Sequence, residues 1–193
     1  MTTSPAPRPA AGLRVFTRTA AFAPTASQCI DAAWLLAESA IGTHPGPVAR
    51  VIAIANGGTR PATVIAEYLK VPRFTVLARH NTGPEPWQQA TGRVTVELPA
   101  DLPTRLKGRT LLVDDIAGSG ATFTAVREAL ADRLPTSASL ECAALCCNTG
   151  TAVQPDRWIW DVDDWVHFPW EPPHDGPTRP MPISFQVKVP ARA

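Results

Sequence analysis

The stretch Thr110-Leu-Leu-Val-Asp-Asp-Ile-Ala-Gly-Ser-Gly-Ala-Thr122 decides the fold of this chain. Residues 110–113 form a short, mostly apolar run that predicts a strand buried on both faces. Residues 114–120 predict the loop that follows the strand, and residues 122–134 predict a helix, whose inner face carries Phe123, Val126, Ala129 and Leu130. A strand that passes through a short loop into a helix is the building unit of an α/β fold.

Similar units flank this stretch on both sides. Thr25-Ala-Ser-Gln28 is a capping box that starts a helix with apolar residues at helical spacing: Ile30, Ala33, Trp34, Ala37 and Ile41. Further strands are expected over 48–55, 73–78, 93–98 and 138–147, and a further helix over 62–69. This order predicts a mostly parallel, twisted sheet flanked by helices.

The length and the prolines define the domain organisation. With 193 residues and a mass of 20.6 kDa, the chain predicts one domain, which we place at residues 13–193. Residues 1–12 predict a disordered tail. Many of the 21 prolines lie at the two ends, so we also expect an irregular, proline-rich tail within residues 151–193.

The composition argues against several classes of function. The net charge is +1, from 18 basic and 17 acidic residues, which does not favour a general nucleic-acid binder. No apolar run approaches the roughly 20 residues of a membrane helix, and the N-terminus does not resemble a secretory signal, so we expect a cytosolic protein. Of the 4 cysteines, three lie together in one apolar run (142, 146 and 147). Their spacing favours buried reduced thiols over a metal site.

The chemistry is concentrated in the loop after the central strand. Asp114 and Asp115 stand at the carboxyl end of this strand, where open α/β sheets bind ligands. The small residues that follow allow a phosphate to approach the backbone N–H groups at the helix N-terminus. The carboxylates can accept hydrogen bonds from hydroxyl groups or hold hydrated Mg²⁺. This combination indicates a sugar phosphate, and it is neither a Walker loop nor a dinucleotide fingerprint.

The same stretch resembles the 5-phosphoribosyl-1-pyrophosphate (PRPP) motif of type I phosphoribosyltransferases. The resemblance implies transfer of 5-phosphoribose from PRPP to a nitrogen of a nucleobase or similar heterocycle, with Mg²⁺ as cofactor and pyrophosphate released. It assigns catalysis and metal binding to Asp114 and Asp115. It assigns 5′-phosphate binding to six successive residues: Ala117, Gly118, Ser119, Gly120, Ala121 and Thr122. It also implies a small hood formed by the terminal segments, a homo-oligomer, and a place in purine salvage or specialised nucleoside metabolism.

Two further segments extend the resemblance to roughly residues 25–171. Ile54-Ala-Asn-Gly-Gly58 resembles the pyrophosphate loop of the family, which implies contacts from Asn56, Gly57 and Gly58. Because Asn56 stands where the family often has a basic residue, the positive charge is expected from Arg79, with Arg60 and His80 as alternatives. Residues 79–92 correspond to the loop that closes over the reacting centre in this family.

The third segment, Asp164-Trp-Val-His-Phe-Pro-Trp-Glu171, resembles the late segment of xanthine-guanine and archaeal hypoxanthine phosphoribosyltransferases. There the resemblance implies that Trp165 stacks on the base and that the Val166 backbone reads its edge. Glu171 is expected near the base or as a further Mg²⁺ ligand. Residues 151–193 would therefore contribute the base-binding hood. We expect Trp158 and Trp160 in a local hydrophobic cluster or a dimer contact, and Asp161 and Asp163 in solvent.

One departure from the family pattern leaves the acceptor open. In 6-oxopurine enzymes the position of Gly118 carries a carboxylate that contacts the purine. Adenine-type relatives have a small residue at this position, but the segment around Trp165 does not resemble theirs. Two other classes of function remain as alternatives: a regulator that senses PRPP without turnover, and a non-catalytic scaffold subunit of the same fold.

Overall fold

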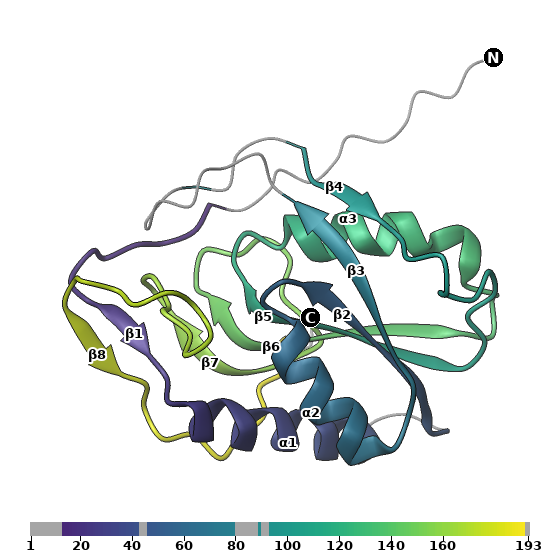
Figure 1. Ribbon diagram of the computed structural model, residues 1–193, viewed down its shortest axis with the longest axis horizontal. Coiled ribbons are helices and arrows are strands. Elements are labelled where there is room, and N and C mark those ends of the chain that lie inside the picture. Colours follow the sequence, from purple (N-terminus) through teal and green to yellow (C-terminus); the bar gives the residue numbers. More distant parts are fainter. Residues whose placement is uncertain (1–12, 43–45, 80–88, 90–92, 192–193) are drawn as a thin grey trace.

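The computed structural model describes residues 13–42, 46–79, 89 and 93–191 (Figure 1). Its centre is a six-stranded sheet in the order β4-β3-β2-β5-β6-β7. The strands are β2 (Val48–Ala55), β3 (Arg73–Arg79), β4 (Thr95–Glu97), β5 (Arg109–Ala117), β6 (Ser139–Asn148) and β7 (Arg157–Val162). All neighbouring strands of this sheet are parallel except β3 and β4. The predicted α/β class with a mostly parallel sheet is confirmed.

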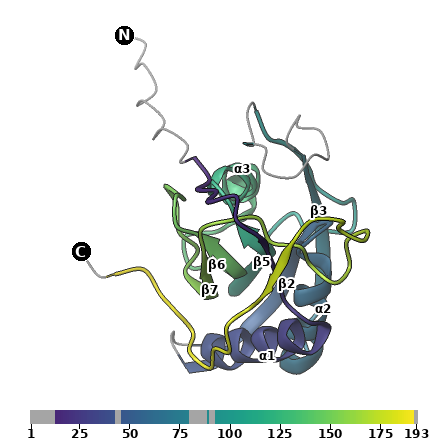
Figure 2. The same cartoon turned by 90° about the vertical axis from the view of Figure 1, so that its left-hand side faces the viewer.

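Helices cover both faces of the sheet (Figures 1 and 2). One face carries α1 (Ala26–Gly42) and α2 (Thr59–Leu69). The other carries α3 (Ala121–Leu130), which continues into the short 3-10 helix η1 (Ala131–Arg133). The sheet therefore lies between two hydrophobic layers, as both faces of a parallel sheet require.

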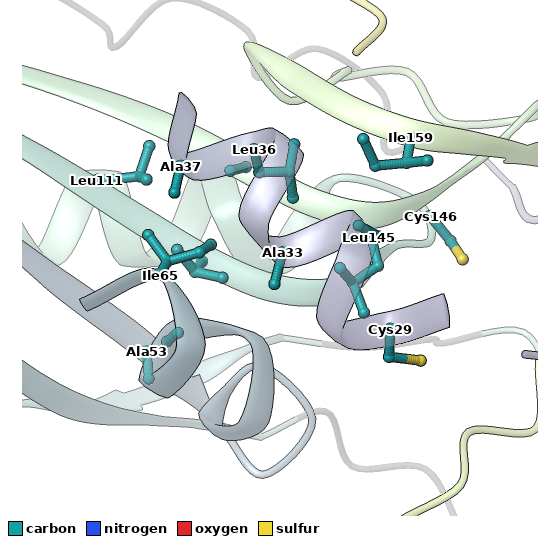
Figure 3. Close-up of a cluster of buried hydrophobic side chains, with 14 of the residues drawn as sticks. Cys29, Ala33, Leu36, Ala37, Ala53, Ile65, Leu111, Leu145, Cys146 and Ile159 are labelled. Atoms are coloured by element: carbon teal, nitrogen blue, oxygen red, sulfur yellow. The ribbon is translucent and has the colours of Figure 1, made fainter. Parts of the chain in front are cut away.

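Small side chains let α1 lie close to the sheet (Figure 3). Ala33, Leu36 and Ala37 point from α1 toward a layer that includes Leu145 and Ile159 on the strands. Only part of the apolar set predicted from helical spacing belongs to this buried face. Ile30, Trp34 and Ile41 are exposed, whereas the buried face consists of Cys29, Ala32, Ala33, Leu36, Ala37 and Ala40.

The central strand is longer than the sequence predicted, and this changes the place of the acidic pair. β5 runs to Ala117, so Asp114 and Asp115 belong to the strand and not to the loop after it. The extension follows from pairing with β6, in which Ile116 lies opposite Cys146 and Ala117 opposite Cys147. A strand fixed by a parallel ladder holds side chains more rigidly than a loop does.

The expected hood is present beside the main sheet (Figures 1 and 2). Its core is a parallel pair of strands, β1 (Ala21–Ala23) and β8 (Thr178–Pro180), which the sequence pattern did not indicate. The Arg179 guanidinium lies 3.8 Å from the centroid of the Phe22 ring and ties the two strands together. β7, which falls inside the predicted 151–193 hood segment, is an edge strand of the main sheet. The predicted N-terminal tail, residues 1–12, lies outside the described residues.

Other predictions about buried groups can be checked directly. All four cysteines are buried and free, and burial raises the pKa of Cys29 and Cys142 to about 12. Trp158 and Trp160 are buried in the core, as expected for a hydrophobic cluster. Within the described part of the chain, none of the helices has the length and apolar character needed to cross a membrane.

A buried ion-pair network fixes the amino ends of three strands. Arg109 begins β5 and donates through Nε to Glu141 Oε1 on β6 at 2.9 Å. Arg157, which begins β7, pairs with the other oxygen of the same carboxylate. Arg109 also donates to the carbonyl oxygen of Ala40 at 2.8 Å, near the end of α1. One buried carboxylate therefore pairs with two buried guanidinium groups at the edge opposite the acidic pair.

We expect Glu141→Gln to lower the free energy of unfolding by about 3 kcal/mol, because it leaves two buried cations without their counter-charge. Urea denaturation followed by tryptophan fluorescence measures this. The matched control is Glu67→Gln, at an exposed position on α2, which should change stability by less than about 0.5 kcal/mol. Equal effects of the two substitutions would show that the network contributes no special stability.

Candidate active site

The acidic pair stands at the carboxyl end of β5, in the middle of the sheet. Asp114 and Asp115 are 9% and 8% exposed, so both carboxyl groups are largely removed from water. The Asp115 N–H donates to Asp114 Oδ1 at 3.0 Å, which fixes the orientation of the first carboxylate. Successive residues of a strand face opposite sides of the sheet, and both of these carboxyl groups border cavities at its edge.

Burial shifts both acids toward their neutral forms. It raises the pKa of Asp115 to about 6, with a further increase from nearby Glu171 and an opposing effect of Arg14. The pKa of Asp114 is also raised, first by burial and then by the charge of Asp115. The ionised forms of such a pair are stabilised most by a ligand that supplies hydrogen-bond donors or positive charge to the carboxylates.

The Gly57-Gly58 turn lies directly against the acidic pair. A β-carbon built on Gly57 would lie 2.0 Å from Asp115 Oδ2, and one built on Gly58 would lie 2.3 Å from the carbonyl oxygen of Val113. Only glycine fits this turn without displacing its neighbours. The Gly58 N–H donates to the carbonyl oxygen of Ile54 at 2.9 Å and is therefore used inside the turn. Asn56 is exposed at the same edge of the sheet.

The small-residue loop after β5 lines a cavity of about 100 Å³ at the N-terminus of α3. Its walls include Asp114, Asp115 and the predicted phosphate-binding residues 117–120 and 122; Ala121 begins the helix. Gly120 has a positive φ of 84° and caps α3 without a side-chain hydrogen bond, which leaves the first turn of the helix accessible to an anion. The Ala121 N–H lies 3.4 Å from Ser119 Oγ.

A second cavity, of about 210 Å³, lies between the acidic pair and the hood. It is bordered by Asp115, Trp165, Val166 and Glu171, which joins the predicted base-binding residues to the predicted ribose site. It is smaller than the roughly 300–1,000 Å³ of pockets for drug-sized ligands. A single heterocyclic ring system is the kind of ligand that suits this space.

The backbone around Trp165 is held by the hood strand β1. The Phe22 N–H donates to the Trp165 carbonyl at 2.8 Å, and the His167 N–H donates to the Phe22 carbonyl at 2.8 Å. In this parallel bridge the N–H and C=O of Val166 point to the opposite side of the chain. Val166 lines the cavity, and the reading of a base edge by its backbone stays a prediction.

Glu171 is fixed by its own neighbours. Its Oε2 accepts a hydrogen bond from the Phe168 N–H at 3.0 Å and lies 3.4 Å from His167 Nδ1. Among the described residues, no three acidic, histidine or cysteine side chains converge as a group that could hold a metal ion. Asp114 and Asp115 remain as carboxylates for Mg²⁺, which commonly uses one or two protein carboxylates together with substrate phosphates and water.

The predicted sources of positive charge for pyrophosphate lie farther from the two cavities or outside the described residues. Arg79 ends β3 and is exposed; since Leu77 pairs with Ala55, it lies at the same sheet edge as the Gly57-Gly58 turn. It borders neither of the two cavities described above. Arg60 lies on α2 and lines a separate apolar pocket. His80 and most of the expected closing loop, 79–92, lie outside the described residues.

Sequence reasoning missed the N-terminal part of the site. Arg14 borders both cavities, and its guanidinium carbon lies 5.9 Å from the centroid of the Trp165 ring. Burial lowers the pKa of Arg14, while Asp115, Asp114 and Glu171 oppose this change. No pattern in residues 13–20 indicated such a role, because the contact depends on how the segment folds back over the sheet.

Two buried polar residues hold this segment in place and were also missed. Asn148 ends β6, and its Oδ1 accepts from the Val15 N–H at 2.7 Å. Asp164 accepts from the Thr17 hydroxyl at 2.6 Å and from the Thr19 N–H at 3.0 Å. For Asn148 a signal existed in the sequence: it is a polar residue at the carboxyl end of a strand that pairs with β5.

The fold and the site thus indicate a class of protein: an α/β domain with an acidic pair and an open helix N-terminus at the carboxyl edge of its sheet, the arrangement predicted for a sugar phosphate. Comparison with known proteins then identifies the family. A model of the phosphoribosyl transferase domain matches residues 27–176. The chain is 31% identical over 131 residues to the xanthine-guanine phosphoribosyltransferase of Nitratidesulfovibrio vulgaris, covering 65% of this chain and 71% of that protein.

Two further similarities agree. The xanthine-guanine phosphoribosyltransferase of Ruegeria sp. is 29% identical over 144 residues, which cover 72% of this chain and 76% of that protein. The crystal structure of a purine phosphoribosyltransferase from Pyrococcus horikoshii superimposes with a TM-score of 0.64 at 24% identity, over 78% of this chain and 93% of that chain. The similarity to the Pyrococcus horikoshii structure shows the fold of this chain.

The chain belongs to the phosphoribosyl transferase domain family, as a type I member close to the xanthine-guanine and hypoxanthine enzymes. It is a PRPP-dependent pentosyltransferase. The resemblance noted in the sequence is confirmed.

We expect Gly57→Ala to reduce kcat/KM by about 100-fold, because the added methyl group displaces the Asp115 carboxylate from its position beside the substrate. Steady-state kinetics of pyrophosphate release measure the loss. Gly42→Ala is the matched control, since a β-carbon there meets nothing within 4 Å. A Gly57→Ala enzyme with near-normal kcat/KM would show that the close contact between turn and carboxylate has no role in the reaction.

We expect Asp115→Asn to stabilise the protein at pH 7.5 and much less at pH 4.5. Because the pKa of Asp115 is raised to about 6 in the folded state, its ionisation opposes folding as the pH rises from about 4 to about 6. Removing the charge should add about 1–3 kcal/mol to the free energy of unfolding at pH 7.5. Denaturant titrations at both pH values measure this, with exposed Asp101→Asn as the control. A loss of stability at pH 7.5 would contradict the assigned pKa shift.

Proposed function

We propose that this enzyme binds PRPP along the carboxyl edge of β5 and transfers its 5-phosphoribosyl group to a nitrogen of an oxygen-bearing heterocycle in the cavity beside Trp165. The observation that carries the proposal is the contact between two cavities. A polar cavity at the N-terminus of α3 and a cavity lined by Trp165 share the Asp115 carboxyl group as part of their walls.

The donor half of the proposal rests on the loop and the turn on either side of the acidic pair. The 5′-phosphate would be bound by the backbone and hydroxyl groups of residues 117–122, helped by the dipole of α3. Asp114 and Asp115 would accept hydrogen bonds from the ribose hydroxyl groups. Pyrophosphate would lie near Asn56 and Gly57, with Arg79 from the neighbouring strand as a source of positive charge.

Displacement at the anomeric carbon develops positive charge on the ribosyl group as the bond to pyrophosphate breaks. Asp114 and Asp115, when ionised, would offset this charge on a ribose bound beside them, and their low exposure would strengthen the effect. Binding of the distant 5′-phosphate orients the anomeric carbon toward the acceptor nitrogen. The acceptor nitrogen forms its new bond to this carbon and later loses its proton, so the protein needs no covalent nucleophile.

Mg²⁺ fits the donor site as a companion of PRPP. Asp114 and Asp115 are the residues that would hold it, together with oxygens of the substrate. When bound, the ion neutralises charge on the leaving pyrophosphate. Glu171 as a further ligand stays a prediction, since its Oε2 is engaged by the Phe168 N–H.

The acceptor half rests on the hood. Trp165 offers an aromatic surface on which a heterocycle can stack, and the Val166 backbone offers one donor and one acceptor for its edge. The curated relatives are named for xanthine and guanine, so a purine and a role in purine salvage are our first candidates. Gly118 lacks the carboxylate that contacts the purine in 6-oxopurine enzymes, which favours an acceptor that does not need this contact.

We also propose a homo-oligomer in a reducing compartment such as the cytosol. Ile30, Trp34 and Ile41 share one exposed face of α1, and an exposed apolar stripe of this kind favours self-association. Four buried, free cysteines fit a reducing compartment. A PRPP-sensing regulator of the same fold is not favoured, because the net charge of +1 does not favour binding to nucleic acid.

The experiment that tests this function is a screen of nucleobases for pyrophosphate release from PRPP with Mg²⁺. We expect at least one oxygen-bearing base to be turned over by the wild-type enzyme. Asp114→Asn with Asp115→Asn should lower kcat by about 1,000-fold or more, because it removes the charges that stabilise the transition state. Unchanged far-ultraviolet circular dichroism would show that the fold persists. A double variant that keeps near-normal turnover would contradict the placement of the ribose site.

A further inference from the structure

The N-terminal segment before β1 crosses the site and is held there by two side-chain amides. The Arg14 N–H donates to Gln89 Oε1 at 2.9 Å, and Gln89 Nε2 donates to the Arg14 carbonyl at 2.6 Å. Asn148 makes the same pair of bonds to the next residue, Val15, at 2.7 and 2.9 Å. Four hydrogen bonds thus fix the backbone of two successive residues, from which the Arg14 side chain extends into the site.

Two glycines leave the space into which the segment fits. A β-carbon built on Gly150 would lie 2.1 Å from the carbonyl oxygen of Leu13. One built on Gly118 would lie 2.0 Å from Arg14 Nε and 2.4 Å from Nη2. The guanidinium of Arg14 therefore occupies the volume that any side chain at position 118 would need.

The guanidinium is placed to meet a ligand. It lies between Gly118 and Trp165, at the boundary of the two cavities. Its Nε is buried, and no acceptor among the described residues lies within hydrogen-bond distance of it. A buried N–H without an acceptor is costly, and a ligand oxygen would remove that cost. Arg14 lines one cavity with Asp114 and Asp115 and the other with Asp115 and Glu171, so it also offsets the negative charge that an anionic ligand would meet.

We propose that Arg14 is a specificity-determining residue. Its guanidinium, which occupies the space beside Gly118, binds an oxo or carboxylate oxygen on the acceptor heterocycle. The inference rests on the proposed function and names the chemical class of its acceptor. The acceptor is favoured over the 5′-phosphate as the partner of Arg14, because the guanidinium lies beside Trp165. The phosphate loop also has donors of its own in its backbone and in Ser119 and Thr122.

The test compares nucleoside monophosphates that share a sugar phosphate and differ in one oxygen-bearing group of the base. Orotidine and uridine 5′-monophosphate form one pair, and xanthosine and inosine 5′-monophosphate form the other. Ribose 5-phosphate alone measures the donor site. Calorimetry gives Kd for these five compounds with wild-type protein, Arg14→Gln and Arg14→Lys. The matched control is Arg18→Gln, at an exposed position of the same segment.

In at least one pair, the wild-type protein should bind the member with the additional carboxylate or oxo group (orotidine or xanthosine 5′-monophosphate) at least about tenfold more tightly than its partner. This is the difference expected for a charge-assisted hydrogen bond. Arg14→Gln should abolish this preference and change the Kd of ribose 5-phosphate less than about threefold, since the phosphate loop is intact. Arg14→Lys should retain part of the preference because it keeps the charge. Arg18→Gln should behave as the wild type.

Three results would overturn the inference. The first is no preference within either pair in the wild-type protein, and the second is a preference that survives in Arg14→Gln. The third is an Arg14→Gln variant in which ribose 5-phosphate weakens as much as the nucleotides do, which would make Arg14 a ligand of the phosphate. Failure of ribose 5-phosphate to bind the wild-type protein is a separate outcome. It would overturn the proposed function, and this inference with it.

Discussion

The site depends on one close contact: the glycine turn after β2 against the Asp115 carboxyl group of β5. The two strands are direct neighbours in parallel register, with Ala53 opposite Val113, so the chain leaves both at the same edge. Neither Gly57 nor Gly58 has room for a β-carbon in this arrangement. The turn that would hold pyrophosphate and the carboxylates that would hold ribose are therefore brought together by strand pairing, before any ligand binds.

The energetic cost of the site is concentrated in its carboxylates. Burial disfavours the ionised forms of Asp114 and Asp115, and Glu171 adds to the effect on Asp115. The opposite edge of the same sheet carries the ion-pair network in which the buried Glu141 carboxylate pairs with Arg109 and Arg157. A sheet anchored at its amino edge can keep an electrostatically unfavourable cluster at its carboxyl edge, where a substrate supplies the missing partners.

Local sequence patterns predicted most of the fold, because buried strands appear as apolar runs and capped helices as apolar residues at helical spacing after a capping motif. The acidic pair, the glycine turn and the tryptophan of the hood were identified because each belongs to a short contiguous motif. The β1–β8 pair and the role of Arg14 escaped prediction, since each depends on contacts between residues far apart in the chain, such as Val15 with Asn148. The face of α1 was only partly predicted, because the packing distance to the sheet selects alanine over the larger apolar residues.

The N-terminal segment changes how the site is understood. The family motif describes a donor site that ends at the phosphate loop, whereas here a residue outside the motif lies over that loop at Gly118. The two cavities meet at Arg14, which contributes to both. If Arg14 contacts the acceptor as proposed, substitutions in a segment that carries no catalytic group would change which acceptor the enzyme uses.

The most direct test of the central claim is a crystal structure of the protein with ribose 5-phosphate. We expect the phosphate against the N-terminus of α3, with its oxygens about 3 Å from the amides of the loop at residues 118–122. The ribose hydroxyl oxygens should lie within hydrogen-bond distance of Asp114 and Asp115. A sugar phosphate bound away from the carboxyl end of β5, or bound there with its hydroxyl groups turned from both carboxylates, would contradict the account.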